Sequence, residues 1–280
     1  EEWERARLTL LSILHTTPSV LLEEILLIDD GNPVGDSRWD WREKAKAIHP
    51  KVRIHSNGKR EGLIRSKNIG VDLAKAPIVF FMEPHMIAQK HWLEPLLDRV
   101  VSGSTTAGIP VLDIIPEDDF NQYHTVPPQL AGFDSALEFN WYETAGDRNQ
   151  TWKAPQPYPV RLMPGGVFLI RKSEFHRFGE FDPGMLQWGG ENLEMSVKLW
   201  SCGGSMETIP CSRFGHVFRA KNPYPVQVSQ VITNQKRFAS VWAQPMLDRF
   251  LQLKPRAVSL DIGDISDRLA LKERLKKILK

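Results

Sequence analysis

The sequence predicts an α/β fold with a Rossmann-like, mostly parallel sheet flanked by helices. Short apolar runs of strand length alternate with segments of helical spacing throughout the first half of the chain. Turn residues, such as those at 31–33, separate the two kinds of segment. The 280 residues, 41% of them hydrophobic and 25% charged, suffice for one large domain with a substantial core.

The first half divides into individual elements. Trp3, Leu10 and Ile13 recur at helical spacing, and Pro18 ends this helix. The segment 24–30 is an apolar run that ends in two acids, as expected for a buried parallel strand. Further strands are expected at 52–56, 77–82 and 106–113, and further helices at 41–48, 63–74 and 92–101.

The second half is less regular. Loops are expected at 116–132 and 155–164, a strand at 166–171 and a helix at 191–200. The tail 267–280 has a Leu/Lys amphipathic pattern, which predicts a helix packed against its own domain. No internal repeat divides the sequence, so residues 1–280 are predicted to form one domain.

Charge and composition exclude several classes of protein. Lys and Arg number 36 against 34 Asp and Glu, and the net charge of +2 provides no field that recruits nucleic acid or anionic membrane. No apolar run reaches the roughly 18 to 20 residues of a membrane span. Cys202 and Cys211 are too few for a disulfide scaffold or a zinc knuckle, and they leave the redox compartment open. Because residue 1 is Glu, the chain is expected to be a piece of a longer protein.

Acidic side chains follow two of the predicted strands. Ligands of open parallel sheets bind beyond the carboxyl ends of strands, where Asp30 and Glu83 lie. Residues two apart in an extended segment point the same way, so Glu83 and His85 can meet one ion. A carboxylate with an imidazole suits Mn²⁺ or a similar divalent cation. The alternative is that both acids are solvated loop residues, and Asp30 before Gly-Asn-Pro is ordinary turn chemistry.

Three further segments combine charge with turn residues. Arg60 precedes a predicted helix, whose first amides can hold an anionic ligand. The segment 188–192, Trp-Gly-Gly-Glu-Asn, places an acid at a helix start, which is also favourable for the helix alone. His216 beside Arg219 offers a second imidazole, although a lone histidine is more often a packed or surface residue. Neither a Walker lysine motif nor G-x-G-x-x-G is present, which argues against ATP hydrolysis and dinucleotide binding.

In this order along the chain, the motifs resemble the catalytic domain of the polypeptide N-acetylgalactosaminyltransferases. The resemblance runs from Trp3 to Lys280 and rests on Asp-Asp at a strand end, Arg-Glu-Gly-Leu-Ile-Arg, acid-x-His, Trp-Gly-Gly-Glu-Asn and Gly-His-Val-Phe-Arg. It implies a GT-A fold and the retaining transfer of GalNAc from UDP-GalNAc, with Mn²⁺, to Ser or Thr of a polypeptide. That reaction initiates mucin-type O-glycosylation.

The resemblance also implies a cellular location and the binding partners of the protein. The parent would be a type II membrane protein of the Golgi lumen. Its anchor, the family's first strand, a C-terminal lectin domain and the disulfide partners of Cys202 and Cys211 would lie outside residues 1–280. The expected partners are the UDP-sugar and an acceptor peptide, with membrane contact only through the anchor.

Site residues carry over position by position. Glu191, Asn192 and Arg219 match residues at the reacting centre, and Glu191 and Asn192 are on the sugar side. The donor would be bound by Asp30 and Arg60 at the uridine end, by Glu83 and Pro84, by Gly165 and Gly166 beneath the sugar, and by Trp188, Arg219 and Tyr224 around the diphosphate and the closing loop. The metal ligands would be Glu83, His85 and His216, and the acceptor peptide would lie on Phe139, Trp141 and Phe218.

The sequence departs from the family pattern at the metal motif. The family's Asp-x-His is Glu83-Pro84-His85 here, with a side chain one methylene longer and without an N–H at Pro84. This departure favours a second hypothesis, a relative that binds UDP or peptide with little or no transfer. It also predicts that shortening Glu83 to Asp raises activity. A third hypothesis, another UDP-sugar as donor, is disfavoured by Glu191-Asn192. The stretch after Tyr224 lacks the family's Gly pair, so loop closure is expected to differ.

Overall fold

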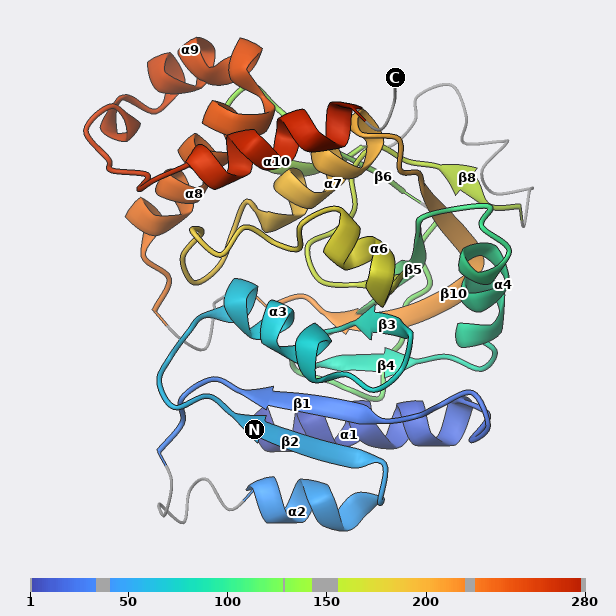
Figure 1. Ribbon diagram of the computed structural model, residues 1–280. Helices are drawn as coiled ribbons and strands as arrows, with labels where there is room; N and C mark the ends of the chain where they lie inside the picture. Colours follow the sequence, from blue (N-terminus) through green and yellow to red (C-terminus); the bar gives the residue numbers. More distant parts are fainter. Residues whose placement is uncertain (1, 34–40, 128, 143–155, 220–224, 278–280) are drawn as a thin grey trace.

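The computed structural model describes residues 2–33, 41–127, 129–142, 156–219 and 225–277, and their strands form three sheets (Figure 1). A two-stranded sheet pairs β1 (Ile25–Asp29) with β2 (Val52–Ser56). The main sheet has the order β3 (Ile78–Phe81), β9 (Phe168–Arg171), β5 (Ala107–Ile115), β10 (Met206–Val217) and β4 (Met86–Ala88), with β8 (Tyr158–Pro159) also beside β10. A hairpin joins β6 (Leu130–Phe133) and β7 (Phe139–Tyr142).

Helices connect and cover these strands. The predicted helix and strand at 41–48 and 52–56 have those bounds in the structure, and the first helix ends two residues before Pro18. The helices are α1 (Glu2–Thr16), α2 (Trp41–Ile48), α3 (Leu63–Leu73), α4 (Leu93–Val101), α6 (Lys172–Arg177), α7 (Glu191–Ser201), α8 (Val228–Trp242), α9 (Gln244–Leu253) and α10 (Ser266–Lys277), with a 3₁₀ turn η2 (Pro255–Ala257).

Strand directions are more mixed than the sequence pattern predicts. β1 and β2 are parallel, as are β5 and β10, but β9 is antiparallel to both β3 and β5. β4 is antiparallel to β10. A parallel pair needs a long crossover connection, which α2 supplies between β1 and β2. Only residues 82–85 separate β3 from β4. This connection is too short for the crossover helix that would make the two strands parallel neighbours.

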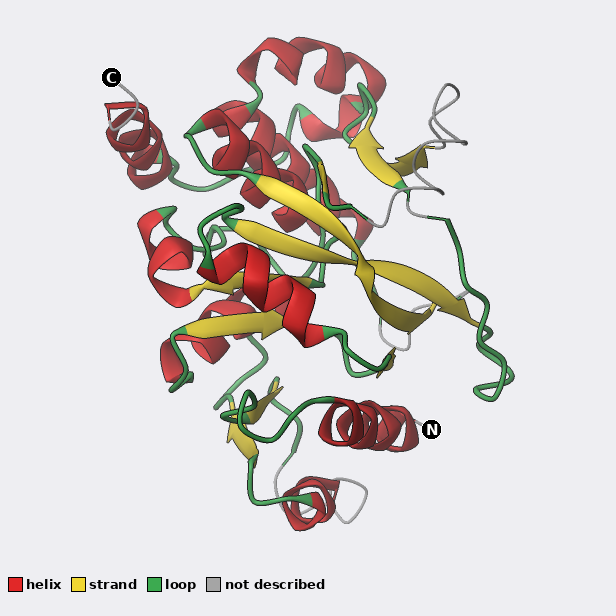
Figure 2. Ribbon diagram, turned by 90° about the vertical axis from the view of Figure 1, so that its right-hand side faces the viewer, coloured by secondary structure: helices red, strands yellow, loops and turns green. Residues whose placement is uncertain are grey.

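The main sheet is buried on both faces. Along β9, Phe168 and Ile170 belong to the core cluster under α7 and α8, whereas Leu169 between them belongs to the cluster under α4. This alternation is the period of two expected for a strand with opposite faces. Figure 2 shows helices on either side of the strands. The apolar run at 166–171 is therefore a strand with core on both faces.

The C-terminal helix packs as its sequence predicts. Leu275 of α10 is fully buried, and the Lys272 ammonium lies 5.9 Å from the ring centre of Trp242 on α8. No disulfide joins Cys202, which is buried, to Cys211, which is exposed. Among the described residues, no helix has the length and apolar character needed to cross a membrane.

Candidate functional site

The turn between β3 and β4 brings two predicted metal ligands beside the third. Glu83 and His85 lie in this turn, and β4 then pairs antiparallel with β10 so that Met86 is opposite His216. The backbone amide of Val217 donates to the His85 carbonyl at 3.2 Å. The two imidazole rings lie 4.9 Å apart. Strand pairing thus assembles Glu83, His85 and His216, as the sequence predicts for a metal site.

One carboxylate oxygen joins the cluster. Glu83 Oε2 lies 2.9 Å from Nε2 of His85 and 3.0 Å from Nε2 of His216. Burial alone would raise the pKa of Glu83, but the hydrogen bonds from His216 and His85, together with their charges, outweigh it and hold that pKa well below its usual range. The carboxylate therefore remains ionised at neutral pH.

These residues fit a divalent cation. One ligand atom from each of the three side chains lies within 4.8 Å of the other two, and all three side chains are partly buried. Nδ1 of each imidazole is buried without a hydrogen-bond partner among the described residues, so neither ring is fixed by protein contacts at that atom. One carboxylate and two imidazoles form a donor set compatible with Mn²⁺.

Gly166 forms the surface against which Glu83 rests. A Cβ atom at Gly166 would lie 2.8 Å from Glu83 Oε1 and 3.2 Å from its Cγ, closer than side chains normally approach. At the adjacent Gly165, a Cβ atom would lie 3.6 Å from Glu191 Oε1 and from Asn192 Cβ. The predicted backbone floor therefore connects the metal cluster to the residues predicted for the sugar.

Replacing Gly166 with alanine is expected to weaken Mn²⁺ binding about tenfold or more. The new methyl group must displace the Glu83 carboxylate. Displacements on the order of 1 Å at a reacting site can lower a reaction rate about 10²-fold. Calorimetric titration with Mn²⁺ and UDP measures the effect. Gly165→Ala is the matched control, because its Cβ atom makes only ordinary contacts. Equal affinities in the two variants would contradict the argument.

Glu191 and Lys67 form a buried pair next to this floor. Glu191, the first residue of α7, is 2% exposed, and its Oε2 accepts a 2.9 Å hydrogen bond from the Gly189 amide. Its Oε1 lies 3.5 Å from Lys67 Nζ, which donates to the Gly165 carbonyl at 2.7 Å. Asn192 is 8% exposed, and its Nδ2 lies 3.4 Å from the Met163 carbonyl. An ammonium and a carboxylate thus face the glycine floor.

Lys67 was not predicted from the sequence. It lies on α3 between Ile64 and Val71, two buried apolar residues at helical spacing. The sequence signal for Lys67 is a lysine between two apolar positions of one helix face. A lysine at such a position is buried, and a buried ammonium needs a charged or polar partner.

Asp30 and Arg60 lie where β1 meets the start of α3. The Asp30 carboxylate accepts the Glu61 amide at 2.7 Å and the Gly62 amide at 2.8 Å, and it also binds Asn57 and Ser66. Both carboxylate oxygens are therefore already used to hold the turn. The Arg60 side chain is exposed.

The two residues that follow β10, Phe218 and Arg219, contact different parts of the molecule. Phe218 packs edge-on against His216, with ring centres 4.3 Å apart, and is 43% exposed. Arg219 Nη2 instead donates to Glu2 Oε2 at 2.5 Å, at the start of α1. Pro84 is exposed in the turn between β3 and β4, and Tyr224 lies outside the described residues.

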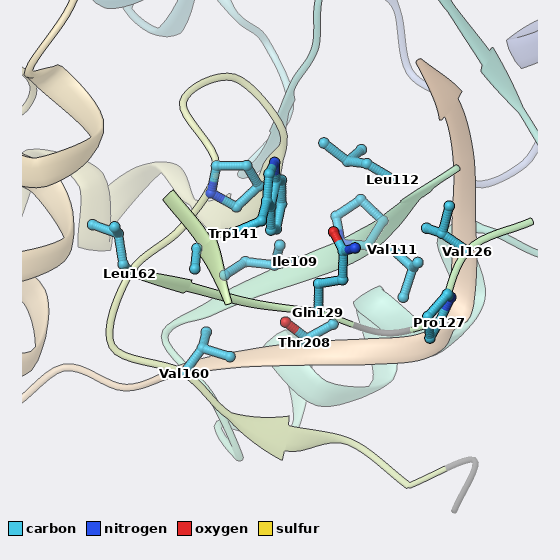
Figure 3. Close-up of a pocket in the computed structure, with 13 residues that line it drawn as sticks. Ile109, Val111, Leu112, Val126, Pro127, Gln129, Trp141, Val160, Leu162 and Thr208 are labelled. Atoms are coloured by element: carbon cyan, nitrogen blue, oxygen red, sulfur yellow. The ribbon is translucent and has the colours of Figure 1, made fainter. Parts of the chain in front are cut away.

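The predicted acceptor residues Phe139 and Trp141 are on β7. Their rings meet edge to face at 5.1 Å, and Trp141 is 37% exposed. Trp141 lines a shallow depression of mixed polar and apolar character between the hairpin and β5, to which Gln129 and Thr208 also contribute (Figure 3). Phe218 packs against His216 instead, so the contacts among the described residues join two of the three predicted acceptor residues.

Comparison with known proteins identifies the family. The model of Glycosyl transferase family 2 matches residues 1–163, and the model of the N-terminal domain of galactosyltransferase matches residues 149–222. Polypeptide N-acetylgalactosaminyltransferase 5 of Caenorhabditis elegans is 37% identical over 280 residues, covering 98% of this chain and 45% of that protein. Human polypeptide N-acetylgalactosaminyltransferase 13 is 36% identical over 281 residues, covering 99% and 50%. The chain spans about half the length of these relatives.

A solved structure agrees with these relatives. The crystal structure of GalNAc-T7 with UDP, GalNAc and Mn²⁺ matches with a TM-score of 0.87 and 29% identity, over 98% of this chain and 52% of that one. This likeness confirms the predicted GT-A fold. Because the family match spans more than half of its residues, the chain belongs to glycosyl transferase family 2, and over nearly its whole length it is similar to the polypeptide N-acetylgalactosaminyltransferases.

Proposed function

We propose that this chain is the catalytic domain of an enzyme that transfers GalNAc from UDP-GalNAc to Ser or Thr of a polypeptide, with retention and with Mn²⁺. The observation that carries the proposal is the continuity from the Glu83–His85–His216 cluster, through Gly165-Gly166, to Glu191 and Lys67. A cluster suited to a divalent cation thus adjoins a buried polar surface suited to a sugar. Relatives that carry the activity in their names support this assignment.

One set of residues would act on the leaving group, and another would bind the sugar. Glu83, His85 and His216 would hold the ion, whose charge would stabilise the departing diphosphate. Glu191 is fixed by the Gly189 amide and by Lys67, so its carboxylate serves to accept hydrogen bonds from sugar hydroxyls. Retention is then achieved by holding the acceptor hydroxyl on the same face as the leaving phosphate. Positioning and electrostatics provide most of the catalysis.

The acceptor is proposed to lie beside the β6–β7 hairpin. Trp141 is 37% exposed and packs edge-on against the half-buried Phe139, and the adjoining depression is also lined by Gln129 and Thr208. An exposed aromatic side chain supplies apolar contact area that an acceptor peptide would cover on binding.

Transfer to a synthetic Ser/Thr peptide, followed by mass spectrometry with UDP-GalNAc and Mn²⁺, tests the proposal. A gain of one N-acetylhexosamine per modified site, lost on chelation, is the expected result. Calorimetric titration with UDP, with and without Mn²⁺, separates the second hypothesis. Metal-dependent UDP binding without transfer would favour the non-catalytic relative that the Glu83-Pro84 substitution suggests, and transfer from another UDP-sugar would favour the third hypothesis.

The setting of the parent protein is proposed on the same basis. Mucin-type O-glycosylation acts on secreted polypeptides, so a Golgi-lumenal enzyme anchored as a type II membrane protein is expected. Localisation of the tagged full-length protein by microscopy tests this, and a cytosolic distribution would contradict it.

Replacing Lys67 with methionine is expected to raise KM for UDP-GalNAc about tenfold while leaving UDP affinity within about twofold. The substitution leaves the buried Glu191 carboxylate without its partner on the sugar side, and an unpaired buried charge is strongly unfavourable. Steady-state kinetics and calorimetry with UDP supply the two readouts. Lys172→Met is the control, since Lys172, like Lys67, donates to backbone carbonyl oxygens, here those of Asp72 and Ala74, but lies outside the site. A parallel loss of UDP affinity would contradict a sugar-side role.

A further inference from the structure

A buried asparagine holds the segment that carries Trp188. Residues 181–190, here called the Trp188 loop, lie between α6 and α7. Asn234 on α8 is fully buried. Its Oδ1 accepts the Leu186 amide at 2.8 Å, and its Nδ2 lies 2.7 Å from the Leu186 carbonyl and 2.9 Å from the Gly189 carbonyl. A further contact of 3.3 Å reaches the Trp188 carbonyl. One side-chain amide therefore binds both sides of Trp188.

The two glycines that follow Trp188 allow this close approach. Gly189 and Gly190 have φ of 98° and 85°, a left-handed conformation that favours glycine. A Cβ atom at Gly190 would lie 3.5 Å from Asn234 Cβ, and one at Gly189 would lie 3.1 Å from Val231 Cγ1. Helix α8 thus packs directly on the loop backbone, and its asparagine can reach the carbonyls there.

The contacts continue from Asn234 to the sugar side. Asn234 binds the Gly189 carbonyl, the Gly189 amide binds Glu191 Oε2, and Glu191 Oε1 faces Lys67. We propose that Asn234 is a positioning residue that fixes Trp188 and the Glu191 carboxylate for binding of the sugar nucleotide. This inference rests on the proposed function, because it is the sugar nucleotide that the two side chains would meet.

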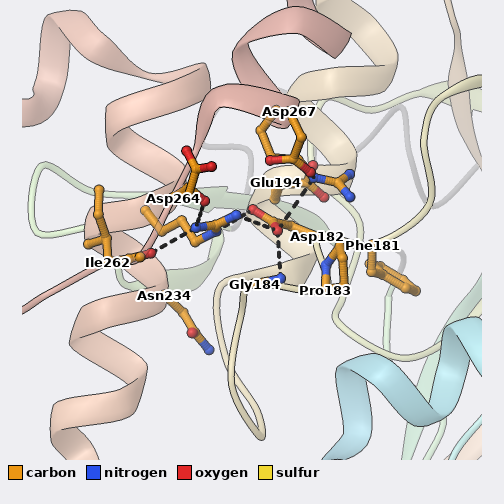
Figure 4. Close-up of polar contacts among 12 residues, drawn as sticks. Phe181, Asp182, Pro183, Gly184, Glu194, Asn234, Ile262, Asp264 and Asp267 are labelled. Carbon is orange, nitrogen blue, oxygen red and sulfur yellow. Dashed lines mark hydrogen bonds and ion pairs between the residues drawn. The ribbon is translucent and has the colours of Figure 1, made fainter.

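The base of the loop is held by other residues. Asp182 accepts Arg237 Nε at 2.7 Å and Nη2 at 3.0 Å, and it also accepts the Gly184 amide at 2.8 Å (Figure 4). Asn68 on α3 binds the Phe181 carbonyl at 2.8 Å and the Phe181 amide at 3.2 Å. The Asn234 contacts begin at Leu186, beyond this base. Loss of the Asn234 amide therefore loosens residues 186–189, which keep the contacts of Gln187 with the Ile64 amide and of Gly189 with Glu191, without removing the anchors at 181–184.

Asn234→Asp is the sharpest substitution to test the proposal. It keeps the size of the side chain and an acceptor for the Leu186 amide, but sets a carboxylate oxygen against the carbonyls of Leu186, Trp188 and Gly189. Asn234→Ser is a second variant that removes the contacts without adding charge. Leu275→Ala, a fully buried position on α10, supplies a destabilised protein whose altered side chain is not part of the loop.

Two readouts distinguish positioning from a loss of stability. We expect hydrogen exchange at residues 186–190 to become at least about tenfold faster in both Asn234 variants, with exchange at 181–184 changed less. We also expect KM for UDP-GalNAc to rise about tenfold or more, since misplacement on the order of 1 Å is costly. Leu275→Ala should show neither change at a comparable loss of melting temperature.

The result that overturns the inference is an unchanged KM and unchanged exchange at 186–190 in both Asn234 variants. Changes equal to those of Leu275→Ala at matched melting temperature would also overturn it. If the parent protein shows no transfer, the proposed function fails, and the comparison of loop exchange and of UDP affinity with Mn²⁺ still decides the role of Asn234.

Discussion

Replacing His216 with alanine is expected to lower Mn²⁺-dependent transfer by about 10²-fold or more, and His85→Ala should do the same. Each imidazole would contribute one of three ligand atoms, and either single variant leaves only Glu83 and one imidazole to hold the proposed ion. Loss of the ion removes charge stabilisation of the leaving group. Initial rates over a range of Mn²⁺ concentrations measure the effect, and far-UV circular dichroism checks that the fold is retained.

The control for this experiment is an exposed histidine outside the cluster. His91, whose side chain is 83% exposed, lies 3.4 Å from Glu94 and outside the cluster. His91→Ala is expected to leave the rate unchanged. Full activity in a well-folded His85→Ala or His216→Ala protein would remove the metal assignment.

Removing the charge of Glu83 is expected to have an effect of similar size. Glu83→Gln keeps the length of the side chain, but an amide offers the ion neither the charge nor the second carboxylate oxygen. We expect kcat/KM to fall about 10²-fold and Mn²⁺ affinity to fall with it. Calorimetry with Mn²⁺ and UDP, together with peptide transfer, measures both. Glu43→Gln, at an exposed position of α2, is the control and should behave as the parent protein.

The positions of the three side chains argue against a gain from a shorter acid at the same position. From the sequence, Glu83→Asp was expected to raise activity by restoring the family's residue. The Glu83 carboxylate, however, already reaches both imidazoles at 2.9 and 3.0 Å while resting against Gly166. Shortening it by one methylene, about 1 Å, would draw it away from both rings, so we now expect a smaller loss than in Glu83→Gln. A rise in kcat/KM at saturating Mn²⁺ would support the original expectation.

Local pattern was sufficient to locate most elements. The helix 41–48 and the strand 52–56 were predicted with their observed bounds, because apolar spacing and flanking turn residues act within the segment itself. The direction of pairing was not predictable in the same way. The apolar run of β9 indicates burial on both faces, but not that its neighbours β3 and β5 run antiparallel to it. Burial on both faces is the same for parallel and antiparallel neighbours, so the apolar pattern carries no information on direction.

By itself, the sequence determined the α/β fold class, the proximity of Glu83 and His85 at the end of a strand, and the acid at the start of α7, although the structure places residues 83–85 in a turn rather than in an extended segment. These follow from periods of two and 3.6 residues and from helix-end chemistry, which are local. Only the tertiary structure decided that His216, 133 residues beyond Glu83, binds the same oxygen. It also decided that Lys67 faces Glu191 and that Asn234 holds the Trp188 loop. Periodicity shows which face of an element is buried, but the partner on that face is selected by packing among segments far apart in the chain.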